Sequence, residues 1–224
     1  ADGDGNFSLT EKPDWLNGFT KTAGDGGTAG EVGTASIEAN SVDLLKDRND
    51  KLKAETVVNN YNLANPTGAA NTVNTANSYV ISAPGKYRIP LVYGNAVKGG
   101  ATNKSSYKTA HTGANVLSNF KDHLGNEITT PYINVQNTAN PATQASIVWM
   151  DQQDLVDGLS VTNDGNKSFV NFHVSAANIK NGNAVIAVKS ADGTIMWSWH
   201  LWFDHSDALS TIESTNHDGA KFKF

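Results

Sequence analysis

A stretch of alternating side chains near the C-terminal end constrains this chain more than any other part of its sequence. Between Ile195 and Phe203, large apolar residues occupy every second position. A period of two is that of a β-strand, whose successive side chains point to opposite faces. One face carries Ile195, Trp197, Trp199, Leu201 and Phe203, and the other carries Met196, Ser198, His200 and Trp202. We predict that the first face belongs to the core, because large aromatic side chains dominate sheet cores.

Other segments have the same strand-like character. Val170, Phe172 and Val174 alternate with Phe169, Asn171 and His173, and 190–193 (Ser-Ala-Asp-Gly) is typical of a hairpin turn. Pro90 lacks a backbone N–H, so its strand is expected to be an edge strand or to carry a bulge. Strands are predicted at 78–82, 86–93, 146–150, 169–174, 184–188 and 194–203. The sequence therefore predicts an all-β protein of the β-sandwich class.

The chain divides into three parts by composition. Residues 1–40 hold short apolar runs cut by glycine, too few to close a stable sheet alone, and are predicted to be a small N-terminal β segment. Residues 41–77 are predicted to be a linker, in which Leu45 and Leu52 have helical spacing; a short helix and an extended arm remain alternatives. Residues 78–224 are predicted to be the β-sandwich domain, and a hydrophobic content of 38% is sufficient for its core.

Charge and residue usage exclude several classes of function. The net charge is -5 and the arginines are Arg48 and Arg88, so the clustered basic face of a nucleic-acid-binding protein is missing from the sequence. The absence of cysteine excludes disulfides, cysteine-ligated zinc and thiol catalysis. No run reaches the roughly 18 apolar residues of a membrane-spanning helix, so the chain is not expected to span a membrane.

Trp202 and His200 are the candidate ligand-binding residues. Both lie on the face opposite the predicted core in the C-terminal strand. An exposed indole at Trp202 would stack on the C–H groups of a sugar ring. The alternative is that a loop or a neighbouring domain covers Trp202.

Metal binding and catalysis have weaker support in the sequence. His200, Asp204, His205, His217 and Asp218 are the one local mixture of metal-ligand types. Their spacing matches no standard zinc pattern, so no metal site is predicted. Asp151 and Asp154 follow a strand and could act as a glycosidase pair, but a solvated turn or a helix cap is the favoured interpretation. No catalytic residue and no cofactor is predicted, since no nucleophile-elbow, phosphate-loop or metalloprotease motif occurs.

Five strings, taken together and in this order, resemble the fimbrillin-like or BACON-associated modular cell-surface proteins of Bacteroidetes. They are 12–19 (KPDWLNGF), 74–85 (NTANSYVISAPG), 90–96 (PLVYGNA), 182–188 (GNAVIAV) and 195–200 (IMWSWH). The chain departs from the family pattern at Ser78, where the pattern has cysteine. The resemblance implies an immunoglobulin-like or fimbrillin-like sandwich, with residues 1–40 as part of a BACON-type unit. It also implies that the chain is an excised piece of a longer protein.

The same resemblance implies a function without catalysis. The expected role is adhesion or structure at the bacterial cell surface, in association with the outer membrane or with fimbriae. The expected partner is a host or microbial glycan or a surface protein. One alternative is a carbohydrate-binding module that uses Trp202 or Trp15. Another is a filament subunit whose alternating tail, Lys221 to Phe224, completes the sheet of a neighbouring subunit.

Overall fold

The computed structural model describes residues 16–23, 34–39, 43–110, 113 and 118–223, and the chain folds as two compact units. The first unit is Ala1–Leu44. In it, β1 (Leu16–Ala23) and β2 (Thr34–Ala39) pair antiparallel. The second unit, Leu45–Phe224, contains the strands of both large sheets. Trp15 lies outside the described residues.

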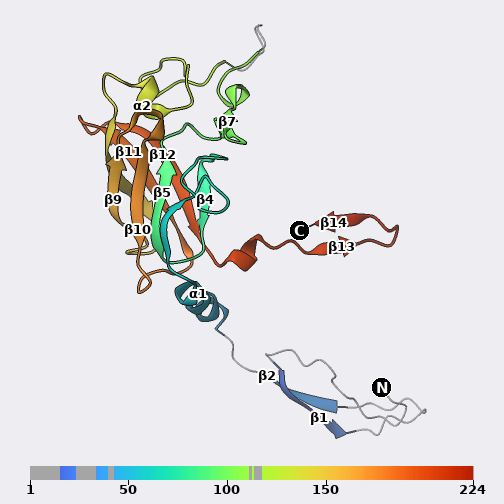
Figure 1. Cartoon of the computed structure of the whole chain (residues 1–224). Coiled ribbons are helices and arrows are strands. Elements are labelled where there is room, and N and C mark those ends of the chain that lie inside the picture. The colour runs from blue at the N-terminus through green and yellow to red at the C-terminus, as the bar shows by residue number, and fades with distance from the viewer. Residues whose placement is uncertain (1–15, 24–33, 40–42, 111–112, 114–117, 224) are drawn as a thin grey trace. The chain divides into compact units, whose positions relative to one another are not determined.

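Two four-stranded sheets pack face to face in the second unit (Figure 1). The first sheet has, in spatial order, β3 (Val58–Asn62), β5 (Gly85–Pro90), β10 (Phe169–Val174) and β9 (Asp157–Thr162). The second has β4 (Ser78–Ile81), β12 (Ile195–Phe203), β11 (Gly182–Ser190) and β8 (Ala142–Met150). The β3–β5 and β4–β12 pairs are parallel and the others antiparallel. The prediction of an all-β sandwich is confirmed.

Short elements connect and flank the sheets. They are the helices α1 (Leu44–Ala54) and α2 (Ile133–Gln136), the 3-10 turns η1 (Lys104–Ser106), η2 (Gly165–Lys167) and η3 (Ser206–Leu209), and the strands β6 (Val97–Lys98), β7 (Ala101–Thr102), β13 (Glu213–Thr215) and β14 (Lys221–Lys223). In the part of the chain that the structure describes, no helix is both long and apolar enough to cross a bilayer.

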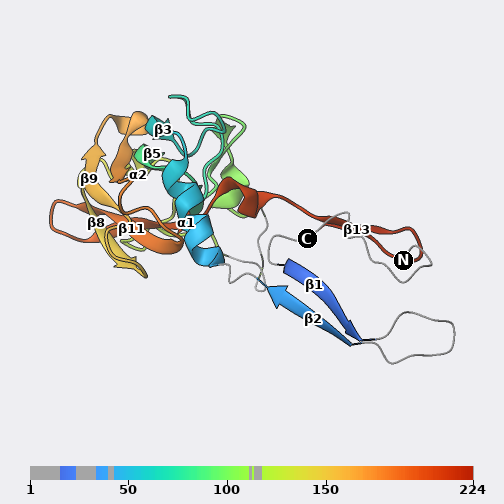
Figure 2. The same cartoon turned by 90° about the horizontal axis from the view of Figure 1, so that it is seen from below.

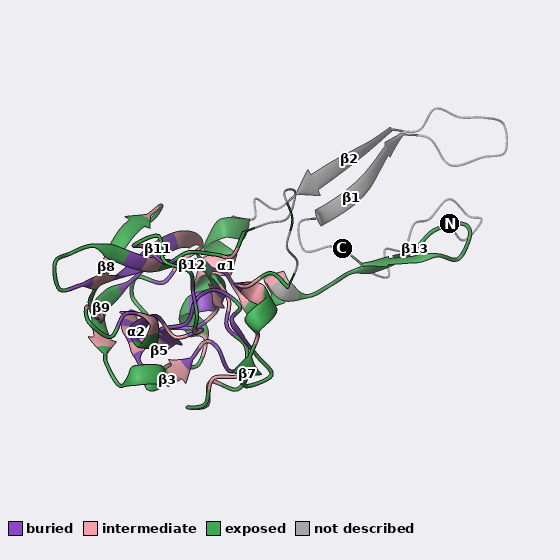
Figure 3. Ribbon diagram, turned by 90° about the horizontal axis from the view of Figure 1, so that it is seen from above, coloured by how far each residue is buried: buried purple, intermediate pink, exposed green. Residues whose placement is uncertain are grey.

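The core lies between the two sheets, where buried residues from both meet (Figure 3). Tyr87 of β5 stacks on Phe172 of β10, with ring centroids 5.6 Å apart. From the opposite sheet, Trp199, Leu201 and Phe203 are almost completely buried. The core prediction for these three residues of β12 is therefore confirmed.

The start of β12 departs from the predicted alternation. Val188 pairs with Trp197 but Lys189 pairs with Ile195, so Met196 is an extra residue in the ladder. This β-bulge changes which side chains point inward. Met196 is buried, whereas Ile195 is 47% exposed. The prediction that Ile195 is a core residue was wrong for this reason.

Residues 41–77, predicted to be a linker, contribute two elements to the fold. Helix α1 packs at one end of the sandwich (Figure 2). Its Leu52 is fully buried, and its Arg48 binds Asp204 at 2.6 Å through Nη2. Asn49 accepts a hydrogen bond from the Asn181 backbone N–H at 2.7 Å. Strand β3 then enters the first sheet beside β5.

The C-terminal strands β13 and β14 form a hairpin of their own. Glu213 pairs with Lys223 and Thr215 with Lys221, and the Lys221 ammonium group lies 2.7 Å from the Glu213 carboxylate. Every residue of both strands is exposed (Figure 3). Neither strand belongs to a four-stranded sheet. The tail that was expected to complete a neighbouring subunit's sheet thus pairs with its own chain, except Phe224, which lies outside the described residues.

Candidate functional site

The outer side of the second sheet carries the two predicted ligand-binding residues. Trp202 pairs with Asn183 and His200 with Val185 across the β11–β12 ladder, and Val185 pairs with Trp149 of β8. On the other side of β12, Ser78 of β4 pairs with His200. Paired residues in neighbouring strands share one face of a sheet. We call this surface the open face and define it by Ser78, Trp149, Asn183, Val185, His200 and Trp202.

Two tryptophans are exposed on the open face. Trp202 is 36% exposed and Trp149 is 51% exposed, although indoles of this size normally lie in a core. Trp149 was not singled out from the sequence, because β8 does not alternate cleanly. A register shift lies between Ile147, which pairs with Ile186, and Trp149, which pairs with Val185. Val148, the extra residue between them, hides the period of two in the sequence.

A chain of hydrogen bonds connects four polar residues across the open face and the end of β8. The Ser78 Oγ lies 2.7 Å from His200 Nδ1, and His200 Nε2 lies 2.9 Å from Asn183 Oδ1. Asn183 in turn donates twice to Asp151, from Nδ2 at 2.9 Å and from its backbone N–H at 2.7 Å. The four residues come from β4, β12, β11 and the turn after β8.

The order of donors and acceptors in this chain follows from Asp151. Desolvation raises the pKa of Asp151, but hydrogen bonds outweigh it, chiefly those from Asn183 and also those from the backbone of Asp151 and Gln152, so the pKa lies below its usual value. Asp151 is therefore a carboxylate at neutral pH and accepts from the Asn183 amide group. The amide oxygen of Asn183 then accepts from His200 Nε2–H, and the Ser78 hydroxyl completes the chain at His200 Nδ1.

The two acidic residues considered as a glycosidase pair have different surroundings in the fold. Both carboxylate oxygens of Asp151 are bonded to Asn183. Asp154 lies in the same turn with a φ of 61°, in the left-handed region. The role that these contacts give Asp151 is to hold Asn183, and through it His200, in position.

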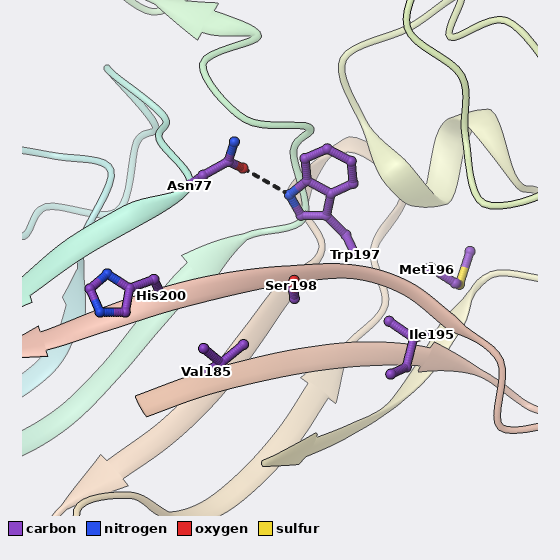
Figure 4. Close-up of a pocket in the computed structure, with 7 residues that line it drawn as sticks. All are labelled: Asn77, Val185, Ile195, Met196, Trp197, Ser198 and His200. Carbon is purple, nitrogen blue, oxygen red and sulfur yellow. Dashed lines mark hydrogen bonds between the residues drawn. The ribbon is translucent and has the colours of Figure 1, made fainter. Parts of the chain in front are cut away.

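A depression of about 380 Å³ lies beside His200 (Figure 4). Its residues are Asn77, Val185, Ile195, Met196, Trp197, Ser198 and His200. The Trp197 indole N–H donates to Asn77 Oδ1 at 3.1 Å, and the Trp197 ring meets Tyr93 edge-on with centroids 5.1 Å apart. These contacts fix one wall of the depression.

The residues considered for metal binding are distributed over separate places. His205 lies 2.8 Å from Glu55 and 3.1 Å from Asp207, and Asp204 binds Arg48. His217 lies near Asp218 in the loop between β13 and β14. Within the described residues, no three metal-ligating side chains gather into a site. His200 is engaged on the open face by Ser78 and Asn183.

No family model, curated protein or solved structure matches this chain. The chemistry of the open face rests on its own residues. Two exposed indoles offer apolar surface, while the polar chain on the same face offers fixed donors and acceptors. This combination suits a ligand that has apolar faces and hydroxyl edges.

Proposed function

We propose that this chain is a non-enzymatic adhesion module of a bacterial cell-surface or fimbria-associated protein, and that it binds glycan on the open face. The observation that carries the proposal is the pair of exposed indoles, Trp149 and Trp202, on one side of a single sheet. A sugar ring presents C–H groups on its faces and hydroxyl groups at its edges. Indoles bind the former, and the hydrogen-bonded chain through His200 is placed to bind the latter.

The size of the site is consistent with this ligand class. The depression beside His200, about 380 Å³, falls within the range of pockets that take small ligands. It adjoins the polar chain, since His200 belongs to both. A sugar unit seated there would contact His200 and Ser198 while the rest of a glycan extends over the sheet.

The location of the protein is proposed from its sequence. The five strings that resemble fimbrillin-like and BACON-associated proteins support a place at the outer surface of a Bacteroidetes cell. The partner is then a host or microbial glycan, or a surface protein that carries one. The proposed function is attachment, which requires no cofactor.

A glycan array with the intact chain tests the proposal. The wild-type protein is expected to bind a subset of glycans, and Trp202→Ala is expected to lose about tenfold or more in affinity, because the indole supplies stacking area. Leu124→Ala is the matched control, since Leu124 is a large apolar residue, 66% exposed, away from the open face. The thermal midpoints of the variants must equal that of the wild type. Binding to no glycan, or equal binding by Trp202→Ala, contradicts the proposal.

The C-terminal hairpin supports a second candidate function, assembly by strand addition. A two-stranded hairpin is marginally stable alone, and among the described residues β13 and β14 pair only with each other. Their outer edges offer unpaired backbone groups to the sheet of another subunit. Light scattering on the intact chain and on a chain without residues 211–224 tests this. Oligomers that require the hairpin support assembly, and a monomer at high concentration in both contradicts it.

A further inference from the structure

We infer that the open face binds an extended, neutral oligosaccharide, with one sugar ring on Trp202 and a different ring of the same chain on Trp149. The inference rests on the proposed glycan binding and names its ligand class. It follows from the spacing of the two indoles and from the charge of the polar chain on the same face.

The spacing comes from the strand register. Trp202 pairs with Asn183 on β11, while Trp149 pairs with Val185, two residues farther along the same strand. The two tryptophans therefore lie two strands apart and two residues apart in register. With about 4.8 Å between strands and about 3.4 Å per residue, their α-carbons are separated by roughly 12 Å. One pyranose ring is too small to cover both indoles, so two rings of one chain are needed.

Strand β11 lies between the strands of the two indoles, and its Asn183 offers a hydrogen-bonding group to the sugar units that bridge them. Asn183 uses one amide hydrogen for Asp151 and retains the second as a donor. Ser78, on β4 at the other side of β12, offers its hydroxyl group to a part of the glycan that extends past Trp202. Ser78 is exposed and Asn183 is partly exposed, so both are accessible to a ligand. Hydrogen bonds to His200 and Asp151 hold these side chains in one position before a ligand arrives. This reduces the conformational entropy that is lost on binding.

The negative charge in the polar chain restricts the expected ligand to neutral glycans. Asp151 is the ionised member of the polar chain, and its pKa is held below the usual value, so it remains negative at neutral pH. Ser78 and Asn183 carry no charge. A carboxylate or sulfate on the sugar would be repelled by Asp151.

The test is a binding titration against neutral oligosaccharides of increasing length, from a single sugar to a hexasaccharide, taken from the series that the array identifies. Wild-type affinity is expected to rise at least tenfold once the chain is long enough to reach both indoles. Trp149→Ala is expected to remove this increase with chain length. Trp149→Phe, which keeps a ring at the site, is expected to restore most of it, and Leu124→Ala to change nothing.

The outcomes separate this inference from the proposed function. If single sugars and hexasaccharides bind equally, or if Trp149→Ala keeps the full dependence on length, the extended-ligand inference is overturned while glycan binding stands. If the wild-type chain prefers sialylated or sulfated glycans, the inference that the ligand is neutral is overturned. If the wild-type chain binds no glycan of any length, the inference and the proposed function both fail.

Discussion

Individual side chains hold the open face in one arrangement, and most of their contacts join distant parts of the sequence. Ser78 and His200 are 122 positions apart, and Asn183 reaches Asp151 across 32. The alternation of β12 placed Trp202 and His200 on the correct side from the sequence alone. Ser78, Asn183 and Trp149 could not be found in the same way, because strand pairing, not local pattern, brings them there. Similarly, Asn49 weakens a local helix prediction, but in the fold it binds the Asn181 backbone.

Asp192 in the turn between β11 and β12 provides a test at the scale of one residue. The Ser190 hydroxyl donates to its carboxylate at 2.6 Å and the Thr194 backbone N–H donates at 3.0 Å. These bonds lower the pKa of Asp192 to about 2 from its usual 3.8. Because the folded pKa is depressed, the stability that this group contributes is present above the usual pKa and is lost as the pH falls through about 2. An NMR titration of the side-chain carboxyl carbon should give this low midpoint; a midpoint at the usual value contradicts the turn geometry.

Among the elements, strands with an apolar run or a clear alternation were predicted, whereas short strands rich in Asn or Gly were not. Residues 169–174 were predicted with the bounds that β10 has. Strands β3 and β9 were missed, since neither the sequence VNNYN nor DGLSVT forms a clean apolar run. Pro90 was expected to mark an edge or a bulge, yet β5 is an inner strand. Pro90 is its last residue, and the pairing with β3 already ends at Arg88, so no partner there requires its missing N–H.

The pairing of β3 with β5 depends on Gly85. Its φ is +142°, and a Cβ there would lie 2.1 Å from the Val58 carbonyl oxygen. Gly85→Ala is expected to force the strands apart and to lower the free energy of unfolding by about 3 kcal/mol or more, in the range of strongly disruptive substitutions. Gly193→Ala is the matched control, because Gly193 also has positive φ, +88°, but no atom lies within 4 Å of its added Cβ. The Gly193→Ala substitution should lower the free energy of unfolding by only about 1–2 kcal/mol, through backbone strain. Urea unfolding measures the free energy of unfolding of both variants. An equal decrease in the two variants would contradict the steric argument.

The molecule as a whole consists of two units, and the second contains both large sheets and the core between them. A chain of residues 43–224 is therefore expected to unfold cooperatively, with a midpoint within about 2 °C of the intact protein's corresponding transition. Calorimetry on the two chains tests this. A midpoint lower by several degrees would mean that the sandwich depends on residues 1–42 for its stability.

The central claim, that the open face is the binding surface, is tested most directly by the indole N–H signals in a ¹H–¹⁵N NMR spectrum during titration with a glycan that the array identifies. Trp149 and Trp202 are exposed on that face, whereas Trp199 is buried between the sheets and serves as the internal control. We predict that the signals of Trp149 and Trp202 shift in proportion to bound glycan and that the Trp199 signal stays in place. Shifts confined to Trp15, or unchanged Trp149 and Trp202 signals at saturating glycan, would contradict the claim.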